Sequence, residues 1–531
     1  MWMVLGLIAL GTYIVVKWVS KNFDFFEKQG VKFVKPYPLI GTNTWLLGRE
    51  NIAVILKKFY DQFPNEKIFG LFNFAAPFYV IRDPDLIKHL AVKEFENFSN
   101  HMKFVDTNHD EFFGSMLTTL RDKKWKEMRS ALSPIFTGSK MRMMFELMSE
   151  VGEEMSEYFW EKYSNQGPVA YDIKNIFSRF TNDVIATCAF GVKCDSFRDP
   201  SNEFFKIGQS FVRFSSPLQM MKFLLIRYFP KTSRTFGLMI FSKDNKNLFY
   251  KMIIENMNTR EKNNIHRPDL INLLMQIRKG ELHHEDGNDD AEHESIAAVK
   301  EEIHNHGNIS AKKLWTDNEI IAQCFLFFIA GFETSSATLR YLAYELATNP
   351  EVQEKLVTEI DKLHENLDGS HLSYEKIQSL KYLDMVISET LRKWPAAFTT
   401  DRQCSKDFTY KGDDGLEFNL EKDMVIWIPI YGLHMDPKYY PEPEKFDPER
   451  FDESNRHNLN LNAYLPFGIG PRNCIGSRFA LMEMKIAIYY LLLKFTFEVG
   501  PETQVPLKLK RTPNGLQPDV DVKLRLQPRH V

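Results

Sequence analysis

Apolar residues recur at helical spacing over most of this chain, whereas only a few short stretches show the alternation that is typical of strands. The helical pattern predicts long helices over residues 141–163, 320–348, 350–366, 375–394 and 477–495. The strand-like stretches are residues 78–83, 424–431 and 521–527. The expected fold class is therefore mainly α with a small β part.

One segment, residues 279–310, is low in apolar residues and interrupts this pattern. Its histidines could indicate a metal site; they are His283, His284, His293, His304 and His306. They are spread among acidic residues and glycines without convergent spacing. This composition favours a solvated loop over a metal site.

The N-terminal residues form an apolar stretch with no charged side chain before Lys17. As a helix, residues 1–19 would be about 28 Å long, close to the roughly 30 Å hydrocarbon core of a bilayer. We therefore expect residues 1–22 to be a membrane anchor. The alternatives are a buried helix and a cleaved signal peptide, but no basic leading region or small-residue cleavage site is clear. The lysines that follow predict that the rest of the protein lies on the cytosolic side.

Pro36, Pro38 and Gly41 follow this stretch. A Pro-X-Pro sequence stiffens a connector and ends any helix before it. We expect residues 23–41 to be a hinge, with an ordinary loop as the alternative, and residues 42–531 to form the body of the protein.

Composition excludes some classes of function. The net charge of −3 gives no indication of nucleic-acid binding. The five cysteines are an odd number without a CxxC pair, which excludes a disulfide framework and a zinc ribbon and favours a reducing compartment. The 44 phenylalanines would fill either a large core or an apolar ligand cavity, and composition alone does not separate the two.

One cysteine, Cys474, lies in the glycine-rich stretch FGIGPRNCIG, residues 467–476, directly before a predicted helix. A thiolate is a strong, soft ligand for iron, and the N–H groups and dipole of a helix start would lower the pKa of the thiol. The glycines allow close approach to a flat cofactor, and Arg472 can reach an acidic group on it. A lone cysteine is usually a small buried hydrophobe, but this frame is a much sharper pattern.

The spacing F-x-x-G-x-R-x-C-x-G resembles, without a gap, the haem-binding loop of the cytochrome P450 family. The resemblance implies that Cys474 is the axial ligand of a haem iron. It also implies that Phe467, Gly470, Arg472 and Gly476 surround the cofactor.

A second motif, AGFETSS, lies in an apolar helical run, where Gly331 costs about 1 kcal/mol relative to alanine and so needs a reason. In the family, the matching helix crosses over the haem, and its hydrogen-bond ladder is loosened to admit dioxygen. The resemblance implies that Glu333 and Thr334 deliver protons, with Ala330 and Gly331 beside the cofactor. The alternative is that Thr334 bonds back to a carbonyl and that Glu333 is solvated.

Two further motifs are similar to the same family. Glu389 and Arg392 of ETLR are spaced i, i+3 and share a helix face. The resemblance implies that Arg450 of PERF joins them in a buried ionic cluster, which is stable only when its hydrogen bonds are satisfied. Haem carries two carboxylates, and several charge-assisted hydrogen bonds are expected around them. The family-based candidates are Trp125 and Arg129 of WKEMR, Arg402, Arg472 and His101.

Family position also predicts an apolar, aromatic-lined substrate pocket above the haem. The candidates are Phe104, Phe112, Phe113, Leu326, Ile329, Ala330, Ala397, Phe398, Thr399 and Leu516. Any single phenylalanine among them could equally be a plain core residue.

The motifs occur in family order, and the resemblance covers about residues 30–531. It implies one large haem domain, where length alone would suggest three or four domains. The sequence looks closest to the microsomal animal branch, which includes vertebrate drug-metabolising and insect detoxification enzymes.

This resemblance implies a monooxygenase that uses haem b and O2 to oxidise lipophilic small molecules at the cytosolic face of the endoplasmic reticulum membrane. Its substrates would be foreign compounds such as plant toxins and insecticides, or endogenous lipids and hormones. Because no nicotinamide or flavin motif is apparent, electrons from NADPH would arrive through NADPH–cytochrome P450 reductase, with cytochrome b5 as a further partner. The alternatives are a haem-thiolate isomerase or dehydratase, which needs no reductase, and a non-catalytic haem-binding protein.

Overall fold

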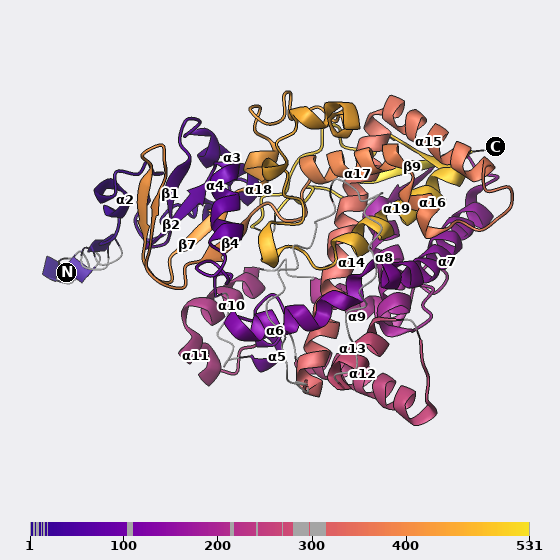
Figure 1. Ribbon diagram of the computed structural model, residues 1–531, viewed down its shortest axis with the longest axis horizontal. Helices are drawn as coiled ribbons and strands as arrows, with labels where there is room; N and C mark the ends of the chain where they lie inside the picture. Colours follow the sequence, from indigo (N-terminus) through magenta and orange to yellow (C-terminus); the bar gives the residue numbers. More distant parts are fainter. Residues whose placement is uncertain are drawn as a thin grey trace.

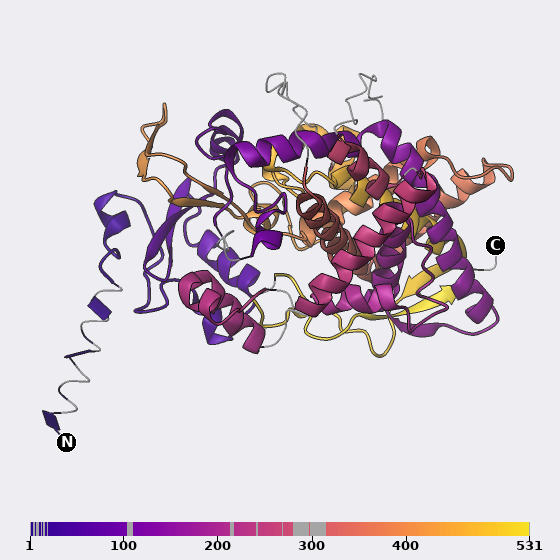
Figure 2. The same ribbon diagram turned by 90° about the horizontal axis from the view of Figure 1, so that it is seen from below.

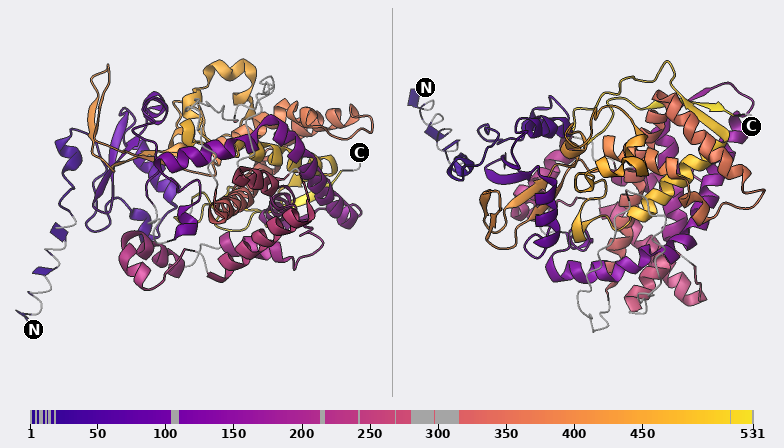
Figure 3. Two further views of the ribbon diagram at one scale, coloured as in Figure 1. Left: turned by 60° about the horizontal axis from the view of Figure 1, so that its bottom comes forward. Right: turned by 45° about the horizontal axis from the view of Figure 1, so that its top comes forward.

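The computed structural model describes residues 20–103, 110–212, 217–240, 243–267, 269–279, 315–513 and 515–529, with Ala297 and scattered positions before residue 20. A four-stranded sheet lies at the N-terminal end of the molecule, and helices build the other end (Figure 1). Two further views show the same division between a β-rich end and a larger helical part (Figure 3). The fold class is mainly α with a small β part, as predicted.

The helices differ widely in length, and the longest is α14. Those before it are α2 (Phe25–Lys28), α3 (Ile52–Asp61), α4 (Pro84–Lys88), α5 (Glu111–Gly114), α6 (Asp122–Leu132), α7 (Gly138–Tyr163), α8 (Ile173–Phe190), α9 (Glu203–Val212), α10 (Pro217–Tyr228), α11 (Pro230–Thr235), α12 (Lys243–Asn263) and α13 (Leu270–Lys279). The others are α14 (Asp317–Thr348), α15 (Pro350–Glu365), α16 (Tyr374–Gln378), α17 (Lys381–Lys393), α18 (Ile430–His434) and α19 (Ser477–Lys494).

The strands form three small sheets. They are β1 (Ile68–Asn73), β2 (Ala76–Ile81), β3 (Val169–Asp172), β4 (Thr400–Gln403), β5 (Phe408–Lys411), β6 (Glu417–Leu420), β7 (Val425–Ile428), β8 (Phe495–Glu498) and β9 (Lys523–Pro528). The largest sheet has the order β1-β2-β7-β4, in which only the β2–β7 pair is parallel. The other two have the orders β3-β9-β8 and β5-β6.

The strongly periodic stretches fold as predicted, with one exception. The predicted helix over residues 375–394 is two helices, α16 and α17, because Leu380 between them is buried with non-helical backbone angles (φ −74°, ψ 88°). The three predicted strands correspond to β2, β7 and β9, whereas the other six strands were not predicted.

Helix α14 is the central element of the helical part. It begins at a capping box formed by Thr316 and Glu319, and it ends before Pro350, which starts α15. Phe325 of α14 packs edge-to-face with Phe249 of α12 and Phe211 of α9, and Phe328 packs edge-to-face with Phe204 of α9. Many of the phenylalanines therefore fill a large core around this helix.

Among the described helices, only α14 has the length and apolar composition needed to cross a bilayer, and more than half of its apolar window is buried within the protein. The predicted anchor lies largely outside the described residues, and its described side chains Trp2, Met3, Leu10 and Tyr13 are exposed. Most of segment 279–310 also lies outside them. No group of His, Cys, Asp and Glu among the described residues could hold a metal ion.

The predicted hinge, residues 23–41, is held against the sheet. Phe26 is fully buried and packs on Phe72 and Tyr79 of the first two strands. Backbone hydrogen bonds also join Lys32 and Val34 to β1. These contacts make the segment part of the β-rich end rather than a free connector.

Candidate active site

The stretch that carries Cys474 is a tight loop directly before α19. Its backbone closes where the Cys474 N–H donates to the Phe467 carbonyl oxygen at 2.8 Å. Gly470 has φ +69°, and a Cβ atom there would lie 2.4 Å from the Ala91 carbonyl oxygen, so only glycine fits. Gly476 is different, because a Cβ atom there would meet only the Phe136 ring at an ordinary 3.7 Å.

The Cys474 side chain is exposed, although Asn473 and Ser477 on either side of it are buried. Although the side chain is accessible, the protein atoms around the thiol desolvate it and raise the pKa of Cys474, while the N–H of Gly476 and the charge of Arg129 act in the opposite direction. The N–H of Gly476 at the helix start lowers the pKa of the free thiol, as predicted, but desolvation is the larger effect and the net shift is upward. A metal ion that coordinates this thiol would deprotonate it.

Helix α14 has an open face near the loop. Ala330 and Thr334, one turn apart, are exposed on a helix whose other residues are mostly buried. Leu326 and Ile329 are half-buried and extend this face by one turn. The ring of Phe136 lies 5.6 Å from the Phe327 ring of α14 and also contacts the cysteine loop at Gly476, so the loop and α14 approach each other across one ring.

The conformation of the AGFETSS motif differs from both interpretations of the sequence. Thr334 Oγ1 donates to the Ala330 carbonyl oxygen at 2.6 Å, as in the alternative. Glu333 is partly exposed, but its carboxylate is also ion-paired, 3.0 Å from Lys174 Nζ of α8. The α-helix is continuous through this point, so the expected loosening of its ladder is not seen. Gly331 packs against α8, since a Cβ atom there would lie 2.4 Å from a methyl group of Ile185.

A cluster of arginines lies around the cysteine loop, and Arg402 in it is fully buried, whereas Arg472, Arg129 and Arg121 are partly buried. The Arg472 guanidinium stacks on the Trp125 ring at 3.9 Å. Burial lowers the pKa of Arg472 to about 8, and the charges of neighbouring arginines act in the same direction. These neighbours are Arg402, Arg121 and Arg129. Burial also lowers the pKa of Arg402 to about 10, and its Nε has no hydrogen-bond partner among the described residues.

His101 pairs with a protein carboxylate rather than standing free beside this cluster. Its Nδ1 lies 3.4 Å from Asp401, whose carboxylate also accepts a hydrogen bond from the Met102 N–H. Burial lowers the pKa of His101, although Asp401 acts in the opposite direction.

Glu389, Arg392 and Arg450 lie together, and all three are largely buried. Glu389 accepts two hydrogen bonds from Arg392, at 2.7 and 2.8 Å, and one from the Asp447 N–H. Arg450 Nε lies 3.5 Å from the same carboxylate. Arg392 also donates to backbone carbonyls, so its charge is well satisfied, whereas the buried Nε of Arg450 has no hydrogen-bond partner among the described residues.

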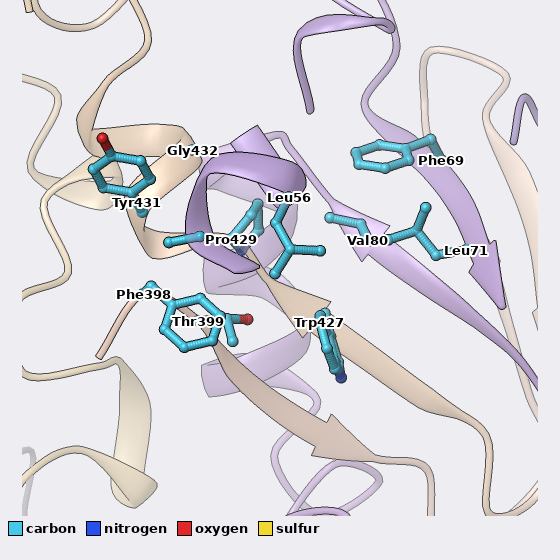
Figure 4. A pocket seen from close by; sticks show the side chains of 11 residues that line it. Leu56, Phe69, Leu71, Val80, Phe398, Thr399, Trp427, Pro429, Tyr431 and Gly432 are labelled. Carbon is cyan, nitrogen blue, oxygen red and sulfur yellow. The ribbon is translucent and has the colours of Figure 1, made fainter. Parts of the chain in front are cut away.

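The predicted pocket residues form two groups. Phe112 packs against Phe325 of α14, and Phe113 lies next to it, near the open face. Phe398 and Thr399 instead line a separate apolar hollow with Leu56 of α3 and residues of the sheet and α18 (Figure 4).

Three other pocket candidates differ in exposure. Ala397 is exposed beside Phe398, and Leu516 is buried, with its carbonyl accepting from the Tyr341 hydroxyl at 2.7 Å. Phe104 lies outside the described residues.

Comparison with known proteins decides the family. Residues 31–526 match the protein family described as Cytochrome P450. The chain belongs to the cytochrome P450 family. It is 39% identical to probable cytochrome P450 9f2 of Drosophila melanogaster over 100% of both chains. It is 40% identical to cytochrome P450 9e2 of Blattella germanica over 97% of this chain and 95% of the relative, and 34% identical to cytochrome P450 6j1 of the same insect over 94% and 92%.

This cytochrome P450 is accordingly a monooxygenase of the predicted animal branch, with haem b as its cofactor and O2 as its oxidant. The arginine cluster fits this cofactor. Arg402 is fully buried and its Nε has no partner among the described residues, so it can take an anion, and haem b carries two carboxylates. The thiol of Cys474 has the donor chemistry that iron takes.

Sequence reasoning missed Lys174 and Asp401, although both contact predicted site residues. Lys174 is 159 positions from its partner Glu333, and Asp401 is 300 positions from His101, so no local pattern could indicate either pair. The only signal in the sequence for Asp401 was that it directly precedes Arg402, a predicted site residue.

Proposed function

We propose that this cytochrome P450 inserts one oxygen atom of O2 into lipophilic small molecules that bind at the open face of α14. The observation that carries this proposal is the placement of the exposed Cys474 thiol and the exposed Ala330 and Thr334 on elements that meet across Phe136. Haem b, when bound, supplies the activation of O2 and the transfer of oxygen.

Each part of the site has its own task. Cys474 ligates the iron, and Arg472, Arg129 and Arg402 bind the haem carboxylates. Thr334 holds the proton that the reaction consumes, but its hydroxyl donates to the Ala330 carbonyl and must rotate before it can pass a proton on. The Glu333 carboxylate must likewise leave Lys174 before it can supply Thr334.

Substrate binding is mainly apolar. Leu326, Ile329 and Ala330 present hydrocarbon surface along the open face, so affinity comes from buried apolar area at ~25 cal/mol per Å². We infer that the substrates are foreign lipophilic compounds, and that the enzyme serves detoxification. The similarity to insect cytochromes P450 supports this inference.

We also propose that NADPH–cytochrome P450 reductase supplies the electrons, with cytochrome b5 as a second donor, at the cytosolic face of the endoplasmic reticulum. Residues 1–22 would anchor the chain there. The exposed Leu218, Met221, Leu225 and Phe229 of the α10 region would form a second membrane contact. Figure 2 shows α10 and α11 beside the N-terminal sheet, which is consistent with one membrane-facing side.

Reconstitution tests the proposal. The full-length protein, incorporated into lipid with the reductase, should form oxygenated products from lipophilic compounds in proportion to NADPH consumed. The Cys474→His variant should lose both this activity and the red-shifted Soret band of the reduced carbon monoxide complex. Product formed without reductase would instead indicate an isomerase or dehydratase, and haem-loaded protein without any turnover would indicate a non-catalytic role.

A further inference from the structure

His434, a buried histidine outside the site, forms hydrogen bonds to two segments that hold the site in place. His434, at the end of α18, has no exposed surface. Its Nδ1 lies 3.1 Å from the Arg392 carbonyl oxygen, and its Nε2 lies 2.8 Å from the Leu465 backbone nitrogen. A backbone N–H can only donate, so Nε2 accepts and the ring proton stays on Nδ1, donating to Arg392. The ring is therefore a neutral imidazole in one defined tautomer.

The surroundings of His434 preserve this neutral form. Burial lowers its pKa to about 3, and the charge of Arg392 acts in the same direction. The ring stacks on Tyr464 at 5.5 Å and meets the edge of Tyr440 at 6.3 Å. Because the packing holds the ring plane, the two hydrogen bonds hold their direction.

The two partners of His434 belong to the two halves of the site's support. Arg392 is the ion-paired residue near the end of α17, held by Glu389. Leu465 comes two residues before Phe467, whose carbonyl accepts the N–H of Cys474. The Leu465 carbonyl also accepts from the loop, through the Gly468 N–H at 3.1 Å. The imidazole is thus a hydrogen-bonded link between the ion pair and the start of the cysteine loop.

We propose that His434 is a positioning residue for the Cys474 thiolate, fixing the start of the cysteine loop on the ion-paired end of α17. The ring can hold the two elements in place because it satisfies a buried donor and a buried acceptor at the same time. This inference rests on the proposed role of Cys474 as the axial ligand.

Two uncharged replacements separate the two hydrogen bonds. In His434→Gln, the amide reaches the place of Nε2 and its oxygen can accept from the Leu465 N–H. In His434→Asn, the shorter amide stands near the place of Nδ1, donates to the Arg392 carbonyl and leaves Leu465 unpaired. Both variants lose the aromatic stacking, so a general loss of packing affects them alike.

The experiment compares the reduced carbon monoxide spectra of full-length protein at matched haem content. His434→Asn and His434→Gln each break one end of the link, so both should convert several-fold more of the thiolate-type red-shifted Soret band into the blue-shifted band of a displaced thiolate than the wild type does. Tyr464→Phe is the matched control, because it removes a buried hydrogen bond to the Ser388 carbonyl in the same core but leaves the link intact. A spectrum of either variant that matches the Tyr464→Phe control would overturn the proposal.

Amide hydrogen exchange decides the case in which His434→Asn binds no haem. Measured on haem-free wild type and variants, exchange at the peptide containing Leu465 should accelerate at least several-fold in the Asn variant only, with α7 unchanged. Uniform acceleration over the chain would refute the link. If the red-shifted band survives in Cys474→His, the assignment of Cys474 as the iron ligand is wrong. That result would refute the ligand assignment and would leave the hydrogen-bonded link through His434 unaffected.

Discussion

A buried acid on α19 provides a sharp test of the interior of this enzyme. Glu483 has no exposed surface, and neither carboxylate oxygen has a hydrogen-bond partner among the described residues. Burial raises the pKa of Glu483 from its usual 4.5 to about 8, although the Ser335 hydroxyl acts in the opposite direction. The folded protein therefore keeps a proton on Glu483 at neutral pH.

This raised pKa makes stability depend on pH. Between pH 4.5 and about 8 the unfolded chain releases the Glu483 proton while the folded protein keeps it, so stability falls as pH rises, by about 1.4 kcal/mol per pH unit. The contribution is complete below pH 4.5 and is lost progressively toward the folded pKa. Glu483→Gln removes this titration. Its unfolding free energy relative to the wild type should therefore rise by about 2 kcal/mol between about pH 6 and about pH 8.

The assay is denaturant unfolding of both haem-loaded proteins in detergent at the two pH values. Comparing the variant with the wild type cancels the titrations that the two proteins share. A stability difference that is the same at both pH values, whatever its size, would show that Glu483 is not a neutral buried acid.

Three further predictions concern the active site. Thr334→Ala should still bind haem and consume NADPH but divert more of it to peroxide; unchanged product per NADPH contradicts the proton role. Lys174→Met frees the Glu333 carboxylate and should raise product per NADPH while changing stability by less than ~1 kcal/mol, with Lys174→Arg as the control; an unaltered ratio argues against a restraining ion pair. Gly470→Ala should abolish folded, haem-loaded protein, whereas Gly476→Ala should keep the fold by circular dichroism, and equal tolerance refutes the packing argument.

Local patterns predicted the long helices and the cysteine loop because their signals lie within a few residues. The periodicity of α7, α14 and α19 is sustained over many turns, so it identifies each helix without knowledge of its partners. Strands such as β4 and β8 have only four residues each, and their partners β7 and β9 lie far along the chain. Their existence depends on pairing that no local stretch contains.

The candidate site shows the same limit. The order of the motifs predicted Glu333 and Cys474 as site residues, but only the structure shows which residues surround them. The pairing of Glu333 with Lys174 needs the packing of α8 on α14, and the raised pKa of the Cys474 thiol needs the desolvation that only a folded interior produces. The reason for Gly331 is likewise tertiary, because it depends on the position of Ile185.

The crowding of arginines around Arg472 has a consequence for the life of this protein in the cell. Without a dianion, mutual repulsion and lost hydration penalise the folded state, so the cofactor stabilises it by mass action. The folded fraction then follows the concentration of free haem. Chains made when haem is scarce remain exposed to proteases for longer, and haem supply becomes a control on enzyme abundance that needs no regulatory site.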